Sequence, residues 1–390
     1  MELLEINKCF QKLRSYCEEQ QYKGWDPYDG LNSRVFKSLP IIRNNRICRL
    51  VWIQFFKKSP INFRPLAGIP KEFNSKGLGL FLSGYCNLYR MKQDKSILDR
   101  IYFLAEKIME LQNRNYSGSC WGYNFDWQAR AFYQPAHTPT VVATSFVADS
   151  LFNAYEITNE QKILETALSA ADFVLQDLNR TYDDKGNFSF SYSPLDDTQV
   201  FNASLLGVRL LIKAYMYNRN ELYRSEARKA VAFVCDRQEE NGAWVYGTLP
   251  FHQWVDNFHT GFDLECINEY QGCTGDKTFD GHLKKGLKFY LESFFLPDGT
   301  SKYYHNKKYP IDIHSPAQLI VVLSKLGLFR DNEPLATNVL TWTLQNMQDQ
   351  KGYFYYQKKK VLSSHIPYMR WAQAWMFYAM SFYLKEREIK

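Results

Sequence analysis

The stretch WGYNFDWQARAFYQPAHTPT, residues 121–140, decides the fold. It is a loop dense in aromatic residues, and it ends in Thr138-Pro139, a pair typical of a helix N-cap followed by proline at the first helical position. The segment that follows, about 139–156, is apolar on nearly every side, as expected of a buried helix. The stretch therefore brings polar and aromatic side chains to the beginning of a buried helix.

Weaker copies of this ending recur along the chain. The residue before each predicted cap falls at positions 74, 137, 197, 259 and 314, in steps of 63, 60, 62 and 55 residues. Aromatic triplets keep a similar period: WGY, FSY, WVY, KYY and FYY begin at 121, 190, 244, 302 and 354. Such a period accommodates one helical hairpin and its loop, so the sequence predicts a repeat of helical hairpins.

Two kinds of helix alternate in this repeat. Helices that are apolar nearly all round are predicted at about 76–92, 139–156, 199–217, 260–272, 316–327 and 370–384. Amphipathic helices are predicted at about 95–113, 160–178, 220–239, 277–294 and 334–348, with residues 2–20 available as a sixth. A helix that is apolar on all sides is buried, and an amphipathic one covers it. We therefore expect an all-α fold, an (α/α)6 toroid of helical hairpins with short strand-like aromatic segments in its loops.

An open solenoid is the alternative to a closed ring. The C-terminal segment WAQAWMFYAMSFYL disfavours it, because the terminal repeats of a solenoid carry a polar face. The sequence has no linker rich in Pro, Gly or Ser that would divide it. We predict one domain over residues 1–390, in which residues 1–60 supply N-terminal helices and a loop that close the ring.

This pattern resembles the six-hairpin glycosidase-like (α/α)6 toroid proteins. Within that group, the WGYNFDWQ stretch resembles proteins associated with bacterial capsule and lipopolysaccharide gene clusters. The resemblance implies a carbohydrate-active enzyme of bacterial polysaccharide metabolism. Enzymes of this fold include glycoside hydrolases, unsaturated-uronyl hydrolases, polysaccharide lyases and sugar epimerases, and the fold alone does not decide among them.

Composition restricts the class of partner. The net charge of +7 is modest for 390 residues, and without a concentrated basic stripe or a nucleic-acid-binding signature it predicts no nucleic-acid partner. No apolar run reaches the roughly 18 residues of a membrane span, and the charged N-terminus does not resemble a signal peptide. The eight cysteines form no CxxC pair, which favours a reducing, cytoplasmic compartment. Nucleotide-binding and metal-binding motifs are absent, so no cofactor or metal is predicted, and the oligomeric state stays open.

The loops that enter the buried helices should meet at one opening of the ring. Histidine suits proton transfer near neutral pH, and glycoside hydrolysis needs two carboxyl groups that face each other across the scissile bond. The candidate catalytic residues are accordingly three histidines and three acids: His137, His259, His314, Asp126, Asp197 and Asp256.

A second set of side chains is suited to holding the substrate. Aromatic rings stack on sugars, and arginines bind carboxylates through paired hydrogen bonds. Glu265 is included because a carboxylate on an apolar helix must be paired or face a cavity. The candidate binding residues are Trp127, Tyr133, Trp254, Tyr368, Trp371, Arg64, Arg130, Arg370 and Glu265.

Three functional hypotheses follow. The first is a glycoside-hydrolase-like enzyme with two carboxylates at the opening, acting on an oligosaccharide or polysaccharide that can contain uronate. The second is a uronate lyase or sugar epimerase that uses His and Tyr for proton transfer. The third is a glycan-binding protein without catalytic activity.

Overall fold

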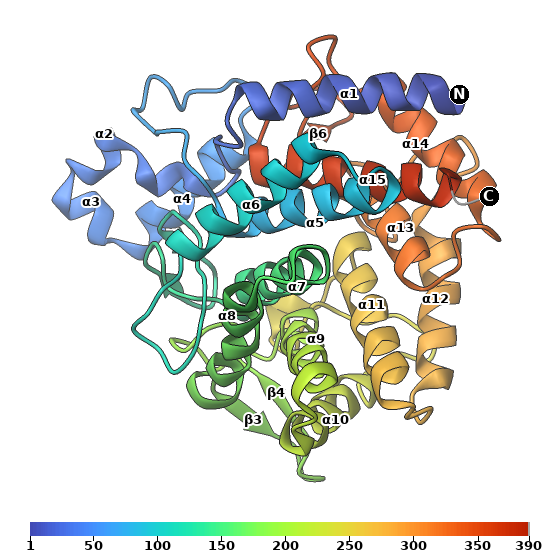
Figure 1. Ribbon diagram of the computed structural model, residues 1–390. Helices are drawn as coiled ribbons and strands as arrows, with labels where there is room; N and C mark the ends of the chain where they lie inside the picture. The colour runs from blue at the N-terminus through green and yellow to red at the C-terminus, as the bar shows by residue number, and fades with distance from the viewer. Residues whose placement is uncertain (389–390) are drawn as a thin grey trace.

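The computed structural model describes residues 1–388 and contains a closed ring of inner helices (Figure 1). Each inner helix packs against the next, and the last packs against the first, which closes the ring. These helices are α5 (Ser75–Met91), α7 (Val141–Thr158), α9 (Phe201–Asn218), α11 (Asn257–Thr274), α13 (His314–Lys325) and α15 (Trp375–Glu388), the last preceded by the π-helical η4 (Met369–Ala374). The predicted (α/α)6 toroid is confirmed, and the open solenoid is excluded.

An outer helix covers each inner one. Their order is α6 (Lys95–Glu110), α8 (Gln161–Asp172), α10 (Glu221–Cys235), α12 (Asp280–Phe294) and α14 (Glu333–Met347), with the π-helical η2 (Phe173–Asp177) extending α8. The sixth is α1 (Leu3–Glu19), which packs against α15 with Ile6, Phe10, Leu13 and Cys17 buried. Residues 2–20 therefore have the predicted role.

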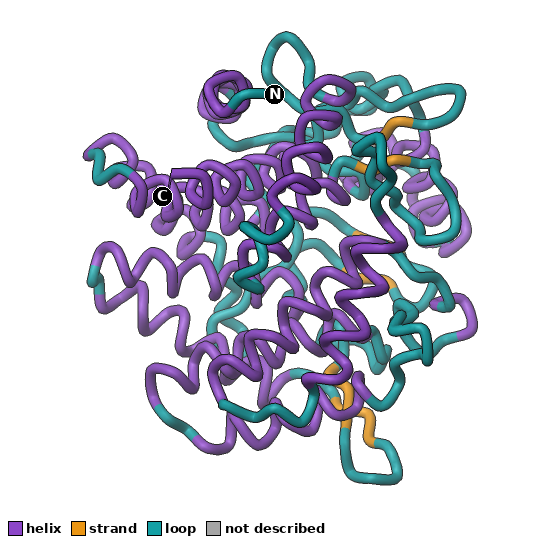
Figure 2. Tube along the Cα trace, turned by 90° about the vertical axis from the view of Figure 1, so that its right-hand side faces the viewer, coloured by secondary structure: helices purple, strands orange, loops and turns teal. Residues whose placement is uncertain are grey.

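Three two-stranded antiparallel sheets lie in the loops. Figure 2 shows strands and long loops gathered on one side of the helices, away from the C-terminus. The pairs are β1 (Trp127–Gln128) with β2 (Tyr133–Gln134), β3 (Arg180–Tyr182) with β4 (Phe188–Phe190), and β5 (Ile311–Asp312) with β6 (Gln357–Lys358). A short 3-10 helix, η3 (Pro250–His252), precedes α11. The inner helices begin on this side, which we call the mouth of the ring.

The aromatic triplets have a structural role in the ring. The first N–H groups of a helix have no partner within the helix. Here, at the start of an inner helix, one such group donates to the carbonyl of a tyrosine in the triplet of the next loop. The pairs are Val141 to Tyr192 (3.0 Å), Phe201 to Tyr246 (3.2 Å), Asn257 to Tyr303 (2.9 Å) and Ile313 to Tyr356 (3.2 Å). A bond from Met369 to Trp25 (3.1 Å) completes the series and joins the two ends of the chain.

The helix starts differ from the prediction. The cap of α7 is Thr140, whose hydroxyl accepts the N–H of Ala143, so the predicted Thr138-Pro139 start is wrong by two residues. His259 lies within the first turn of α11 and His314 begins α13, whereas positions 137 and 197 precede their helices by four residues. Because one turn takes 3.6 residues, such offsets send side chains in different directions. The repeat positions 137, 197, 259 and 314 are therefore not equivalent in the structure.

Residues 20–74 leave the ring and return to it. They contain η1 (Asp29–Asn32), α2 (Arg34–Lys37), α3 (Pro40–Asn44) and α4 (Arg46–Lys58), which stand out beside the mouth at the upper left of Figure 1. Leu31, Phe36 and Ile53 form a small core of their own, and Trp127 of the ring packs against it. Because this core is shared with the ring, we propose that residues 1–390 form one domain.

Candidate active site

Tyrosines line the mouth. One tyrosine of every triplet approaches it, and the hydroxyl groups of Tyr123 and Tyr192 lie 3.3 Å apart. Burial raises the pKa of each of these phenols above its ordinary value, so they stay protonated and can donate hydrogen bonds at neutral pH. The full set is Tyr123, Tyr192, Tyr246, Tyr303 and Tyr356. The triplets are visible in the sequence as a repeat, but these tyrosines were not among the predicted site residues.

An Asp–His pair stands at the start of α11. Asp256 is buried and accepts the main-chain N–H of His259 at 3.1 Å, so it caps the helix. Its Oδ2 lies 2.7 Å from Nδ1 of His259 and also accepts the indole N–H of Trp254 at 2.9 Å. A carboxylate at Nδ1 favours the tautomer with a proton there, which leaves Nε2 with a lone pair. Within residues 1–388, Nε2 has no hydrogen-bond partner.

His314 lies deeper than His259. Its ring is stacked against Phe258, with 4.3 Å between ring centres, and 4.0 Å from the ring of Trp375. Burial, followed by the nearby charges of Lys76 and His259, holds the pKa of its imidazole well below the ordinary value. The ring is therefore neutral. Neither nitrogen bonds to any residue in 1–388, although a buried polar atom normally finds a partner.

Lys76 is the residue that the sequence analysis missed most clearly. It lies in the first turn of α5 and is buried, with its ammonium nitrogen 4.2 Å from the ring centre of Phe146. It forms no hydrogen bond with any part of residues 1–388. Burial, and then the positive charge of Arg370, lowers the pKa of Lys76 well below the ordinary lysine value. A lysine at the start of a helix predicted to be buried all round was the signal available in the sequence.

Asp312 fixes one wall of the mouth. It is fully buried and accepts hydrogen bonds from the indole of Trp371 (2.8 Å), the amide of Gln357 (2.6 Å) and the main chain of His314 (3.0 Å). Burial raises the pKa of Asp312 to about 6. Its bond to Trp371 holds that indole edge-on to His314, with ring centres 5.5 Å apart. The structure thus places the predicted Trp371 in the mouth.

Two of the predicted arginines, Arg370 and Arg64, form ion pairs with carboxylates of the protein itself. Arg370 makes two hydrogen bonds to Asp26, at 2.5 and 2.8 Å. Arg64 bonds to Asp29 at 2.7 Å, and its guanidinium carbon lies 4.7 Å from the ring centre of Tyr368. These pairs fasten residues 20–74 to the ring. The expectation that both arginines and Tyr368 face the substrate is corrected, because their charge and their packing surface are already used.

The predicted acids do not assemble into a facing pair. Asp126 accepts the main-chain N–H of Ala136 at 2.8 Å inside its own hairpin. Asp197 is exposed, whereas its neighbour Asp196 is buried and holds the turn through Ser193. His137 is exposed in a left-handed turn with φ of 64°. Only Asp256 of the predicted acids is buried beside a catalytic candidate, so the assignment of Asp126, Asp197 and His137 to one site is corrected.

The remaining aromatic candidates divide between the mouth and the surface. Trp254 stacks on Tyr246 with 4.5 Å between ring centres, and Trp127 packs against Tyr192 with 5.6 Å between ring centres. These contacts place both tryptophans at the mouth. Tyr133 lies on the hairpin under the guanidinium of Arg49, and Arg130 is exposed near the hairpin turn, so the structure does not bring these two to the Asp–His pair.

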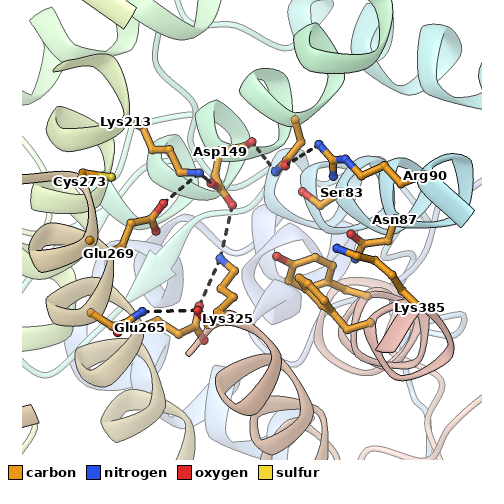
Figure 3. A pocket seen from close by; sticks show the side chains of 15 residues that line it. Ser83, Asn87, Arg90, Asp149, Lys213, Glu265, Glu269, Cys273, Lys325 and Lys385 are labelled. Atoms are coloured by element: carbon orange, nitrogen blue, oxygen red, sulfur yellow. Dashed lines mark hydrogen bonds and ion pairs between the residues drawn. The ribbon is translucent and has the colours of Figure 1, made fainter. Parts of the chain in front are cut away.

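Glu265 lies at the other end of the ring. It is eight residues along α11 from Asn257, which corresponds to about 12 Å of helix at about 1.5 Å per residue. There it lines a pocket of about 330 Å³ between the later turns of the six inner helices (Figure 3). Glu265 pairs with Lys325 at 3.3 Å and with Arg209 at 3.8 Å. The predicted role at the mouth is corrected, because this carboxylate is paired as a buried charge requires.

The polar network around Glu265 extends across that pocket. Lys325 also reaches Asp149 at 3.6 Å, and Lys213 bridges Asp149 (3.6 Å) and Glu269 (2.9 Å), as Figure 3 shows. Positively and negatively charged side chains therefore alternate around this opening, and we call this set of ion pairs the closing network. Among residues 1–388, no group of three or more His, Cys, Asp or Glu side chains is arranged to hold a metal ion. None of the helices in that range is both long enough and apolar enough to cross a membrane.

Comparison with known proteins defines the class of fold. No family model matches the sequence, and no curated protein matches it significantly. Among solved structures, the chain is similar to a cellobiose 2-epimerase from Bacillus thermoamylovorans, with a TM-score of 0.64, 11% identity, and coverage of 82% of this chain and 90% of that one. An α-mannanase of glycoside hydrolase family 76 from Bacteroides thetaiotaomicron has a TM-score of 0.60 and 14% identity, with coverage of 80% of this chain and 87% of that one. An unsaturated glucuronyl hydrolase specific for heparin has a TM-score of 0.58 and 13% identity, with coverage of 80% of this chain and 87% of that one. The chain thus has the six-hairpin toroid fold that these proteins share.

Proposed function

We propose that this protein is a carbohydrate-active enzyme that transfers a proton to and from a carbon atom of a sugar, as a sugar epimerase or isomerase does. The observation that carries the proposal is the 2.7 Å contact between Asp256 and Nδ1 of His259, which leaves Nε2 available at a mouth lined by aromatic rings. The similar folds of a cellobiose 2-epimerase and a D-mannose isomerase support it. The second of the three sequence hypotheses is therefore placed first.

The reaction begins at the carbon next to a sugar carbonyl. His259 removes the proton from this carbon through Nε2, and the electron pair of the C–H bond moves into an enediolate. The imidazolium that forms is stabilised by Asp256, which also fixes the orientation of the ring. Return of the proton to the opposite face of the same carbon gives the epimer, and return to the neighbouring carbon gives the isomer.

Other side chains of the mouth suit the remaining steps. The lowered pKa of Lys76 makes its ammonium a stronger acid than an ordinary lysine, so it is our candidate for returning a proton to the opposite face. The unpartnered nitrogens of His314 are available to hydroxyl groups of the substrate. The tyrosines and Trp254 supply a surface for the sugar ring and phenol groups for hydrogen bonds.

A glycoside hydrolase is the second candidate. One observation favours it: Asp312 has its pKa raised to about 6 by burial, as a general acid requires. The α-mannanase and the glucuronyl hydrolase also share the fold. Against it, Asp312 is fully buried and accepts three hydrogen bonds, and Asp256 also accepts three. Neither carboxyl group is therefore free to donate a proton to the oxygen of a glycosidic bond.

Isotope exchange separates the two functions. The wild-type protein and a His259→Asn variant are incubated in heavy water with cellobiose, D-mannose, N-acetyl-D-glucosamine and D-glucuronate, each in its own reaction. We expect NMR to show deuterium at a carbon next to the carbonyl of one sugar, and the variant to be slower by a factor of about 10²–10⁴. Release of new reducing ends without deuterium would support the hydrolase. Exchange by the variant at the wild-type rate would contradict the role of His259.

Three sequence predictions stay predictions beside this proposal. They are a role in the polysaccharides of capsule or lipopolysaccharide gene clusters, a cytoplasmic location, and a substrate that contains uronate. A glycan-binding protein without activity remains the outcome if none of the sugars exchanges hydrogen or is cleaved.

A further inference from the structure

Residues 30–71 carry an unusual charge. They contain nine Lys and Arg residues and no Asp or Glu, so the rest of the chain sums to −2 within the total of +7. The prediction that the chain has no concentrated basic stripe is wrong for this segment. Six of the nine basic side chains are exposed: Arg34, Lys37, Arg43, Arg46, Lys58 and Lys71.

The same segment exposes an unusual amount of apolar surface. It provides nine of the 21 large hydrophobic residues that are exposed in the described chain, although it is about a tenth of its length. The nine apolar residues are Val35, Leu39, Ile41, Ile42, Ile47, Val51, Phe55, Ile61 and Leu66. Together with the six exposed basic residues they form what we call the apolar–basic surface. Soluble monomers rarely leave such residues clustered without a partner.

Helix α4 shows how the apolar residues are arranged. Ile47, Val51 and Phe55 recur every four residues, so they lie on one stripe of the helix and are 50–70% exposed. The opposite side of α4 is buried through Ile53 and Phe56. Helix α3 packs against α4 and adds Ile41, which is 87% exposed. An amphipathic helix normally turns its polar face outward, and this one exposes an apolar stripe with basic residues at both ends.

We propose that the apolar–basic surface docks the protein on a membrane that contains anionic phospholipids. Apolar side chains enter the boundary between head groups and acyl chains, while Lys and Arg are attracted to lipid phosphates, and helices of this composition lie in the plane of the interface. A second copy of the chain is a poor occupant, because a symmetric contact would place the six exposed basic side chains against six more. An apolar protein partner would leave the basic residues without a counter-charge.

Docking would bring the mouth close to the bilayer. Helix α4 packs against β1, whose Trp127 is at the mouth, and Lys57 at the end of α4 donates to the hydroxyl of Tyr28 at 2.7 Å. Tyr28 in turn lies against Trp127 and Trp371, with ring centres 5.9 and 5.6 Å apart. The proposed membrane surface and the candidate active site are thus joined by one continuous set of contacts. This inference goes beyond the proposed function and does not require it.

Vesicle sedimentation with the full-length chain tests the proposal. The probes are phosphatidylcholine vesicles with and without phosphatidylglycerol, at low and high salt. We expect binding only to the anionic vesicles, with weaker binding at high salt. The double variant Ile47→Glu/Val51→Glu and the double variant Lys37→Gln/Arg43→Gln should each bind at least about tenfold more weakly.

The matched control is Leu4→Glu/Leu222→Glu, which places the same charges on exposed leucines of α1 and α10. It should bind as the wild type does, and circular dichroism should show all variants folded. The proposal is overturned if the wild type ignores anionic vesicles, or if the two test variants bind as well as the control. It is also overturned if the wild type is a dimer that Ile47→Glu/Val51→Glu converts to a monomer. A His259→Asn variant should bind vesicles normally, so failure of the proposed function would not affect this result.

Discussion

The two openings of the ring differ in how their polar groups are satisfied. At the mouth, His259 keeps Nε2 free, and within residues 1–388 neither His314 nor the ammonium of Lys76 has a hydrogen-bond partner through its side chain. At the opposite opening, Lys213 and Lys325 are each paired with two carboxylates. Since unpaired buried groups destabilise a protein, the groups at the mouth that lack a partner point to a ligand there.

Helix direction contributes to this difference. The inner helices begin at the mouth and end at the opposite opening, and helix C-termini favour positive charge whereas N-termini disfavour it. Lys325 is the last residue of α13, and nearby carboxylates raise the pKa of Lys325 and of Lys213. Lys76 lies at the beginning of its helix, where its pKa is lowered. The same residue type is thus stabilised as a cation at one end and destabilised as one at the other.

The largest effect should come from Asp256→Asn at the mouth. Asn caps a helix about as well as Asp, so the fold should persist, but the charge that stabilises the His259 imidazolium is lost. We expect the rate of hydrogen exchange to fall by about 10²–10⁴-fold, with little change in melting temperature. A variant that melts early and exchanges normally would assign Asp256 to stability alone.

Lys325→Met should have the opposite profile. It leaves Glu265 and Asp149 without one of their partners, and breaking a buried ion pair from one side costs about 3–5 kcal/mol. Chemical denaturation measures this loss. The matched control is Lys385→Met in the same pocket, because Lys385 has no ion pair within residues 1–388 and should cost less than about 1 kcal/mol. Equal losses for both would show that the closing network adds no stability.

The two ends should also respond oppositely to pH. Burial alone would raise the pKa of Asp149, but Lys325 and Lys213 bring it below the ordinary value of 3.8, so its contribution to stability is present at neutral pH and lost on acidification. The pKa of Asp312 is raised to about 6, so its contribution is present near pH 4 and lost as the pH rises through 6.

Denaturation from pH 3 to 7 tests this difference. The stability deficit of Asp149→Asn should be largest at pH 7 and shrink below about pH 4. The deficit of Asp312→Asn should be larger at pH 4 than at pH 7. Two deficits that vary with pH in the same direction would contradict the assigned shifts.

The smallest effect should be a gain. Gly272 on α11 lines the opposite pocket, and an added methyl group there meets no other atom within 4 Å. Gly272→Ala should raise the free energy of unfolding by about 0.5–1 kcal/mol without changing the exchange rate. Gly275→Ala is the control, because φ is +73° at that position and the substitution should destabilise. Lower activity in Gly272→Ala would indicate that this opening also takes part in the reaction.

The fold was predictable because its signals are local. Hydrophobic periodicity distinguished inner from outer helices, and the aromatic triplets set the repeat. The site was only partly predictable. His259 and Asp256 could be selected because they enter a buried helix, and they stay predictions as catalytic residues. The ion pair of Arg370 could not be foreseen, because its partner, Asp26, lies 344 residues away. Contacts across the closure of the ring have no local signature, so the occupied arginines and the isolation of Asp126 could not be read from spacing.

The central claim is that the mouth carries the chemistry and the closing network carries stability. The most direct test measures hydrogen exchange into a sugar and thermal unfolding in His259→Asn and Lys325→Met side by side. We predict that His259→Asn loses exchange and melts like the wild type, whereas Lys325→Met melts earlier and retains exchange per folded molecule. Retained exchange in His259→Asn, together with lost exchange in folded Lys325→Met, would contradict the account and place the reaction at the opposite end.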